Sequence, residues 1–284
     1  MKIGIIGQGF VGSAIREGLV GFYDIVTYDI DPTKCNSTHT GVCQEADIIF
    51  VCVPTPMRKT GECDTSILEK AIAEICDACA TLGDAVDENP IIVIKSTIPP
   101  GTTERIAGQH PEFSICFSPE FLTEANSFDD FKNQTRIIVG GPRPATGKVK
   151  QAFRRAFPTI PIIKTGTKTA EMVKYFINCF LATKVTFANE MYDICVESDI
   201  DMDKVTEYAL HDQRIGSSHL TVPGPDGDRG FGGHCFPKDL SAMIFFGTSM
   251  GVSTDFLESV ERKNDSIRTN RDWELMPGRA VSDE

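Results

Sequence analysis

The first thirty residues carry the pattern that most restricts the fold of this chain. The short apolar segment 2–6 reads KIGII, and GQGFVG follows it directly at residues 7–12. An amphipathic segment at 13–20 predicts a helix, and DIVTYD at 24–29 predicts a second strand that ends in an acid. A strand, a glycine-rich turn, a helix and a second strand in this order predict the first unit of a dinucleotide-binding fold.

The glycines of the turn have separate physical roles in that prediction. Gly7 permits the tight turn, Gly9 lets the backbone approach a pyrophosphate, and Gly12 lets the helix pack closely on the strand. The helix N-terminus then meets the phosphates with its partial positive charge.

Asp29 ends the second predicted strand, about 20 residues beyond the glycines, where dinucleotide-binding folds carry an acid. Its carboxylate is suited to accept hydrogen bonds from an adenosine ribose, which favours NAD over NADP with its 2′-phosphate. The sequence therefore predicts NAD as the cofactor. A glycine turn in an unrelated α/β protein is the alternative, and the complete pattern disfavours it.

Apolar runs continue to alternate with helical segments up to residue 167. Further strands are predicted at 46–53, 91–97, 113–119, 135–141 and 160–166, with a helix at 65–79. Such runs predict a Rossmann-type α/β fold, a parallel sheet with helices on both faces. Ligands bind beyond the carboxyl ends of parallel strands. Thr55, Thr97 and the segment 118–125 occupy such ends.

The composition excludes several functions. A formal net charge of −12 without a basic patch disfavours nucleic acid and anionic lipid as partners. No apolar run approaches the roughly 20 residues that span a bilayer. The chain starts directly in a structured motif, so we expect a cytoplasmic protein without a signal peptide. Ten cysteines include an isolated Cys76-x-x-Cys79 with no close histidine, so nine are expected to be reduced and structural, and no metal is predicted.

The second half is predicted to be mainly helical. A long helix at 169–198 is followed by helices at 201–209 and 254–268, which gives a mainly helical domain at 168–268 and a loose tail at 269–284. Lys174 and Asn178 are four residues apart on the long helix and share a face. On spacing alone, a lysine that snorkels to solvent and an asparagine that bonds the backbone are the favoured interpretation.

One cysteine has unusual surroundings. Residues 230–239 read GFGGHCFPKD, so Cys235 follows a glycine-rich collar (residues 230–233) and precedes Lys238 and Asp239. A core cysteine normally lies among apolar neighbours, whereas a nearby cation and a helix that begins near Pro237 favour a reactive thiolate. The arrangement therefore asks for a chemical reason beyond packing in a core.

Five stretches follow one another along the chain in this order: GQGFVG, KSTIPPGT, SPEFLTEA, AEMVKYFINCFLATKVTFANE and GFGGHCFPKD. On these stretches the chain resembles the nucleotide-sugar 6-dehydrogenases, the UDP-glucose/GDP-mannose dehydrogenase family. The resemblance implies an NAD-dependent, four-electron oxidation of a nucleotide sugar at C6, with UDP-glucose to UDP-glucuronate favoured. It also implies that Cys235 traps the intermediate aldehyde as a thiohemiacetal, which is oxidised to a thioester and hydrolysed.

The resemblance assigns roles to the remaining candidates. The implied catalytic residues are Cys235, Lys174, Asn178, Asp239, Thr97 and Glu124. The implied substrate-binding residues are Glu120, Phe121, Leu122, Arg214, Phe231 and Gly232. The implied cofactor contacts are Gly7, Gly9, Phe10, Val11, Gly12, Asp29, Lys34, Thr55, Thr97, Glu124 and Lys238. Lys174 and Asn178 are implied to donate hydrogen bonds to the C6 oxyanion, which reverses the interpretation from spacing.

Arg214 resembles the family arginine that reaches the partner's substrate across a dimer, so a homodimer through the long helix is expected. Three features depart from the family. The expected third domain does not follow the helical domain, the segment 31–46 is short, and His234 and Ala125 replace the usual residues. Two rival functions therefore stay open besides another UDP- or GDP-sugar as substrate. One is a single-hydride dehydrogenase, and the other is a non-catalytic NAD-binding subunit that complements a full-length relative.

Overall fold

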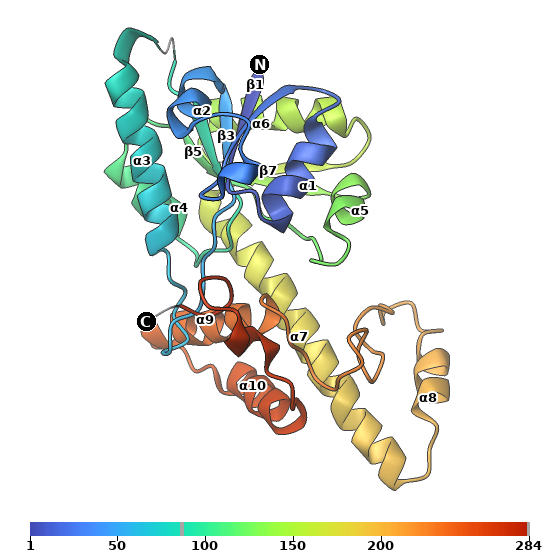
Figure 1. Cartoon of the computed structure of the whole chain (residues 1–284). Helices are drawn as coiled ribbons and strands as arrows, with labels where there is room; N and C mark the ends of the chain where they lie inside the picture. Colours follow the sequence, from blue (N-terminus) through green and yellow to red (C-terminus); the bar gives the residue numbers. More distant parts are fainter. Residues whose placement is uncertain (86–87, 283–284) are drawn as a thin grey trace. The chain divides into compact units, whose positions relative to one another are not determined.

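The computed structural model describes residues 1–85 and 88–282 (Figure 1). Chain contacts divide the protein into unit 1, Met1–Thr55 with Thr65–Lys174, and unit 2, Pro56–Asp64 with the chain from Tyr175 onward. This division differs from the predicted one in two places. The boundary lies at 174/175 instead of 167/168, and the segment 56–64 belongs to the second unit because its backbone bonds to residues near the end of the chain.

Unit 1 contains a seven-stranded sheet with the order β2-β1-β3-β4-β5-β6-β7. Its strands are β1 (Lys2–Ile6), β2 (Asp24–Tyr28), β3 (Ile48–Val51), β4 (Ile91–Ile94), β5 (Ile115–Phe117), β6 (Ile137–Gly140) and β7 (Ile162–Thr165). Neighbouring strands are parallel except β5 and β6, which pair antiparallel through Phe117 and Gly140. The predicted parallel sheet is confirmed apart from this pair, which is antiparallel because the segment 118–136 leaves and re-enters the sheet at the same edge.

Helices cover both faces of this sheet, as predicted (Figure 1). One face carries α1 (Phe10–Leu19), α5 (Ser127–Lys132) and α6 (Arg143–Ala156), and the other carries α2 (His39–Glu45), α3 (Ser66–Leu82) and α4 (Thr102–Gln109). The strands are apolar on both faces because successive side chains point to opposite sides. Ile48 and Phe50 join the α1–α6 core, whereas Ile49 and Val51 join the α2–α4 core. Short 3-10 turns lie at Pro32–Lys34 and Gly83–Ala85.

Unit 2 is helical, as predicted. The long helix α7 (Thr167–Glu197) starts in unit 1 and continues into unit 2, which also contains α8 (Met202–Ala209), α9 (Phe236–Ser249) and α10 (Asp255–Ile267). A core of Cys179, Ala182, Phe231, Leu240 and Val260 joins α7, α9 and α10. No helix in the described part of the chain is long and apolar enough to cross a bilayer.

The described residues of the C-terminal segment pack on the rest of unit 2, so the prediction of a loose tail is wrong for them. A short 3-10 helix spans Asp272–Leu275, and Trp273 and Ala280 are almost fully buried. The Met57 amide donates to the Ala280 carbonyl at 2.8 Å, and the Ser282 amide donates to the Met57 carbonyl at 2.8 Å. The tail therefore packs on the segment 56–64, which sequence patterns did not indicate.

Candidate active site

The glycine turn between β1 and α1 has the geometry that the sequence predicts. Gly7 has a φ of +90°, and a Cβ there would lie 2.6 Å from the Cys52 carbonyl oxygen. A Cβ on Gly12 would lie 1.9 Å from the Gly7 carbonyl oxygen, so only glycine permits this close packing. Gly9 precedes α1 and has open space where a Cβ would stand. The turn thus fits a pyrophosphate at the N-terminus of α1.

Asp29 follows β2 and faces the same turn. Its Oδ2 accepts a hydrogen bond from the Gln8 amide, and its Oδ1 accepts one from the Asp31 amide at 2.9 Å. Lys34 is exposed in the next turn, with its Nζ 3.8 Å from the Asp31 carboxylate. The first turn of α1 contains Phe10 and Val11. The structure therefore brings the acid and the glycines of the predicted cofactor site together.

Thr55 and Thr97 follow the carboxyl ends of β3 and β4, as predicted. The Thr55 hydroxyl donates to the Thr97 carbonyl at 2.7 Å, and both side chains are buried. The Ser96 hydroxyl donates to the Val53 carbonyl in the same region. These bonds tie together the two loops that leave neighbouring strands, at the edge where ligands of such sheets bind.

Lys174 and Glu120 form a buried ion pair in unit 1. The Lys174 Nζ lies 2.8 Å from Glu120 Oε1, and their side chains are 4% and 7% exposed. Burial by itself raises the pKa of Glu120, but the Lys174 charge and hydrogen bonds from Lys174 and the Leu122 amide outweigh it, so the pKa lies below its ordinary value. Lys174 does not reach solvent, which excludes the snorkelling interpretation.

Lys95 is a buried cation that the sequence analysis missed. Its Nζ donates to the Pro119 carbonyl at 3.1 Å and lies 3.4 Å from the Ser118 hydroxyl, so it holds the backbone just before Glu120. Burial lowers the pKa of Lys95 to about 8, although nearby Cys52 and Glu120 partly oppose that effect. The signal available in the sequence was a lysine at the end of the apolar run IIVIK.

The residues after Glu120 differ in their surroundings. The Arg136 guanidinium lies 4.2 Å from the centre of the Phe121 ring, and the Lys174 Nζ lies 5.9 Å from it. Leu122 is half-buried, and Glu124 is exposed. Their contacts with a sugar or with NAD stay predictions.

Cys235 occupies the N-cap position of α9 in unit 2, with a half-buried side chain. Lys238 and Asp239 follow in the first turn, where both are buried and their side chains are hydrogen-bonded. The Asn178 Nδ2 donates to Asp239 Oδ2 at 2.6 Å, so Asn178 bonds a carboxylate and not the backbone. The structure thus unites four predicted residues in one cluster.

The charge on Lys238 favours a Cys235 thiolate. Burial by itself lowers the pKa of Lys238, but the charges of Asp239, Cys63 and Cys235 outweigh it and raise the pKa above its ordinary value. Lys238 is therefore a cation at neutral pH. The interaction is mutual, so this cation stabilises negative charge on Cys235, as does the N-terminus of α9. The NAD contact predicted for Lys238 stays a prediction.

Three predicted substrate contacts have distinct environments in unit 2. The Phe231 ring is buried in the helical core, so its contact with a substrate stays a prediction. Gly232 is half-buried in the glycine collar. Arg214 is exposed, and its Nε donates to Asp212 Oδ1 at 2.9 Å.

The predicted residues are divided between the two units. Unit 1 holds Thr97, Glu120, Glu124 and Lys174, and unit 2 holds Asn178, Arg214, Cys235, Lys238 and Asp239. Joint roles across this division, such as a shared oxyanion site for Lys174 and Asn178, stay predictions.

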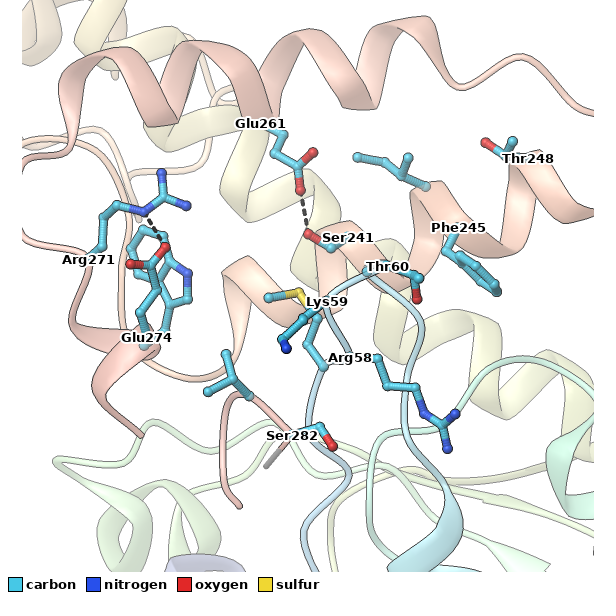
Figure 2. A pocket seen from close by; sticks show the side chains of 15 residues that line it. Arg58, Lys59, Thr60, Ser241, Phe245, Thr248, Glu261, Arg271, Glu274 and Ser282 are labelled. Atoms are coloured by element: carbon cyan, nitrogen blue, oxygen red, sulfur yellow. Dashed lines mark hydrogen bonds and ion pairs between the residues drawn. The ribbon is translucent and has the colours of Figure 1, made fainter. Parts of the chain in front are cut away.

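Unit 2 also contains a cavity of about 670 Å³ between the segment 56–64, α9, α10 and the tail. Figure 2 shows the Ser241 hydroxyl bonded to Glu261 and Arg271 bonded to Glu274 among its lining side chains. Ser241 lies two residues after Asp239 on α9, so the two side chains point to nearly opposite sides of the helix. The cavity is therefore separate from the Cys235 cluster.

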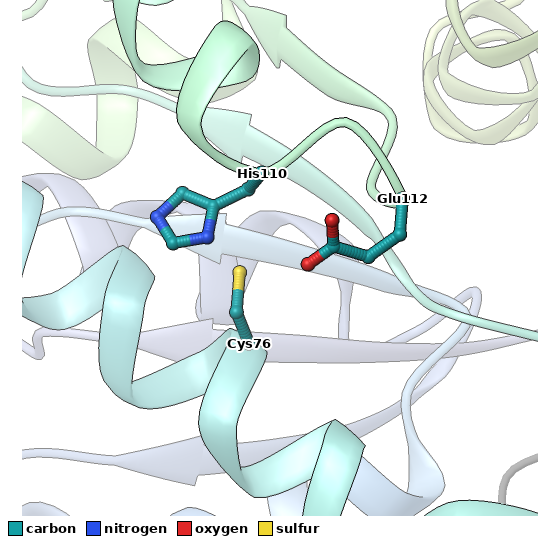
Figure 3. Close-up of side chains that lie close together, drawn as sticks. All are labelled: Cys76, His110 and Glu112. Atoms are coloured by element: carbon teal, nitrogen blue, oxygen red, sulfur yellow. The ribbon is translucent and has the colours of Figure 1, made fainter.

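A cluster of possible metal ligands lies in unit 1. Potential ligand atoms of Cys76, His110 and Glu112 lie within 4.8 Å of one another (Figure 3). The expectation that the C-x-x-C has no close histidine is therefore wrong in the folded protein, because the fold brings His110 close to Cys76 on α3. Burial, with the Glu112 charge, raises the pKa of Cys76 to about 12, so its thiol is protonated and not a ready ligand. The absence of a metal stays a prediction.

We expect Gly12→Ala to weaken NAD binding by roughly tenfold or more, on the order of 1.4 kcal/mol. The added Cβ would overlap the Gly7 carbonyl oxygen and displace the turn. Calorimetric titration of NAD into the purified protein measures this change. Gly108→Ala is the matched control, because no atom lies within 4 Å of its Cβ position. An unchanged NAD affinity in Gly12→Ala would contradict the predicted turn.

Lys95 makes a pH-dependent contribution to stability. Since its pKa falls from 10.5 to about 8 on folding, the unfolded chain binds more protons between these values. The contribution is present above pH 10.5 and is lost as the pH falls through 8. We expect the unfolding free energy of the parent minus that of Lys95→Met to rise by about 3 kcal/mol across this window. Urea unfolding measures it, and a flat difference would contradict the burial of a titrating lysine.

Comparison with known proteins places these features in a family. Residues 37–157 match the NAD binding domain of the UDP-glucose/GDP-mannose dehydrogenase family, and residues 168–266 match its central domain. The chain is similar to the UDP-glucose 6-dehydrogenase TuaD of Bacillus subtilis (strain 168), with 30% identity over 308 residues, which cover 95% of this chain and 64% of TuaD. It is 31% identical over 260 residues to a UDP-glucose 6-dehydrogenase of Rickettsia conorii, which covers 90% of this chain and 57% of that protein.

The fold is similar to that of a UDP-glucose dehydrogenase from the hyperthermophilic archaeon Pyrobaculum islandicum. The TM-score is 0.83 at 27% identity, over 93% of this chain and 68% of that one. The chain therefore spans less than two thirds of the length of the two curated relatives. The two domain matches together cover most of the chain, which belongs to the UDP-glucose/GDP-mannose dehydrogenase family.

Proposed function

We propose that this protein oxidises C6 of a nucleotide sugar with NAD in the cytoplasm, with UDP-glucose as the favoured substrate and UDP-glucuronate as the product. The observation that carries this proposal is the position of Cys235, which lies at the N-terminus of α9 beside a buried Lys238, Asp239 and Asn178. The printed functions of the similar proteins, UDP-glucose 6-dehydrogenases, support the choice of substrate.

The residues of unit 1 fit the cofactor. The turn of Gly7, Gly9 and Gly12 suits the pyrophosphate, and Asp29 suits the adenosine ribose. NAD, when bound, supplies the hydride acceptor for each oxidation. The loops that carry Thr55 and Thr97 leave β3 and β4 at the edge of the sheet where such ligands bind.

The oxidation of a primary alcohol to a carboxylate removes two hydrides, and water supplies the second oxygen. The first oxidation yields an aldehyde at C6. The Cys235 thiolate adds to this carbon, and the former aldehyde oxygen takes a proton to give a thiohemiacetal. Loss of the second hydride and the hydroxyl proton gives a thioester. Water then cleaves the C–S bond, which releases the carboxylate and returns the thiolate and protons.

Buried donors suit the charge that develops in these steps. We assign Lys174 and Asn178 to the C6 oxyanion, because each is a hydrogen-bond donor held by a buried carboxylate. Asp239, Glu124 and Thr97 are assigned to position the water and move protons. Glu120 is assigned to hold the Lys174 ammonium in place through their ion pair, and the segment from Phe121 to Leu122 is assigned to line the sugar site.

A homodimer is the proposed assembly. Phe176, Phe180, Phe187 and Ile194 recur at four- and seven-residue spacing on α7 and are more than half exposed. This spacing forms an apolar stripe on one side of the helix, which a second copy of α7 would cover. Within the described residues, the ion pair of Arg214 is with nearby Asp212, and its side chain is exposed; we assign it to contact the partner's substrate.

We expect two NADH for each UDP-glucose consumed, followed by absorbance at 340 nm, because one active site carries both oxidations. Cys235→Ala should lose at least about 99% of this turnover, since the aldehyde then lacks its covalent partner. Cys195→Ala is the control, a buried thiol at the far end of α7. One NADH with release of aldehyde would instead show a single-hydride dehydrogenase. No turnover despite NAD binding would favour a subunit that complements a full-length relative.

The shared active site has a separate test by complementation. Arg214→Ala and Cys235→Ala should each be inactive alone. A mixed dimer of the two has one site with both residues intact, so co-expression should restore a substantial part of the parent turnover. If Arg214 acts within its own chain, no mixture regains activity.

A further inference from the structure

The backbone of the glycine collar needs contacts from other residues to keep one conformation. Gly230 and Gly233 have φ values of +73° and +69°, both in the left-handed region. Glycine loses more conformational freedom on folding than other residues, so a short segment with three glycines needs outside restraint. Cys235 is two residues beyond Gly233, so any freedom in the collar is passed to the nucleophile.

Asn264 of α10 clamps the first half of the collar. Its Oδ1 accepts a hydrogen bond from the Phe231 amide at 2.7 Å, and its Nδ2 donates to the Phe231 carbonyl at 3.0 Å. The Asn264 side chain is almost fully buried, so both bonds are sheltered from water. A Cβ on Gly230 would lie 2.5 Å from Asn264 Oδ1. The Gly230 amide itself donates to Asn189 Oδ1 on α7 at 3.2 Å.

Asp272, in the tail, holds the second half. Its two carboxylate oxygens accept from the Gly233 amide at 3.1 and 3.2 Å. A Cβ on Gly232 would lie 2.4 Å from Asp272 Oδ1 and equally close to Arg268 Nη2. Gly232 is therefore required so that these two side chains can reach the collar.

Arg268 forms ion pairs with Asp272 and with two aspartates of the loop that precedes the collar. Its side chain is 1% exposed, and its Nη1 lies 2.7 Å from Asp226 Oδ2. Its Nη2 lies 3.6 Å from Asp228 and 3.5 Å from Asp272. A buried guanidinium needs such partners, because a charge left unpaired away from water is strongly destabilising. Arg268 thus ties the loop that leads into the collar to the tail residue that bonds its end.

We propose that Asn264 and Asp272, braced by Arg268, are positioning residues that hold the glycine collar in the shape that places Cys235 for reaction. None of the three is in the predicted catalytic set, and Asp272 lies in the segment that sequence patterns marked as a loose tail. The catalytic consequence rests on the proposed function, whereas the restraint on the collar does not. A displacement of about 1 Å at a reacting group costs on the order of a hundredfold in rate.

Asp272→Ala is the direct test, because Asp272 is partly exposed and its loss leaves the helical core intact. We expect kcat with UDP-glucose to fall by about tenfold or more while KM changes less than threefold, since positioning acts on the chemical step. Asp272→Asn keeps an oxygen acceptor for the Gly233 amide and should regain most of the parent kcat. Asp265→Ala is the matched control, an exposed aspartate on α10 that pairs with Arg271.

Hydrogen exchange tests the same proposal without turnover. In Asp272→Ala, amides of a peptide that covers residues 229–235 should exchange about tenfold faster than in the parent, with α7 peptides unchanged. If exchange is faster in the variant but the parent protein oxidises no nucleotide sugar, the proposed function is wrong. The restraint of the collar by Asp272 is still supported in that case. Unchanged collar exchange would overturn the proposal, as would a parent-like kcat or a loss of kcat that Asp272→Asn does not restore.

Discussion

The pairing of buried charges is the constraint on which the candidate site depends. Lys174 is buried against Glu120 in unit 1, and Lys238 is buried against Asp239 in unit 2. A charge removed from water is costly unless a partner meets it, so each pair fixes the side chains that form it. The pair in unit 2 also raises the pKa of Lys238, which keeps this lysine protonated, the state that a neighbouring thiolate requires.

Glycine solves the complementary problem of bringing backbone close to other groups. In the cofactor turn, the Gly7 carbonyl occupies the space that a Cβ of Gly12 would need. In the collar, Arg268 and Asp272 occupy the space that a Cβ of Gly232 would need. The two glycine-rich motifs therefore share a physical reason, although one suits a pyrophosphate and the other precedes a nucleophile.

Sequence patterns predicted those functional groups whose residues lie within a few positions of one another along the chain. The cofactor turn, the strand ends at Thr55 and Thr97 and the Cys235 to Asp239 cluster are of this kind. The partners that brace them are far apart in sequence. Asn264 and Arg268 fit the buried face of a predicted helix, and no local signal distinguishes them from core residues. The antiparallel pairing of β5 with β6 likewise depends on the path of a connecting segment, which periodicity does not encode.

The central claim is that C6 of the sugar becomes covalently attached to Cys235. Acid quenching during turnover with NAD and UDP-glucose, followed by peptide mass spectrometry, tests it most directly. The account predicts that the peptide with Cys235 gains the mass of the UDP-sugar acyl group, and that the adduct disappears when hydrolysis is allowed to finish. Two NADH for each sugar, with no adduct on Cys235 at any quench time or pH, would contradict the account.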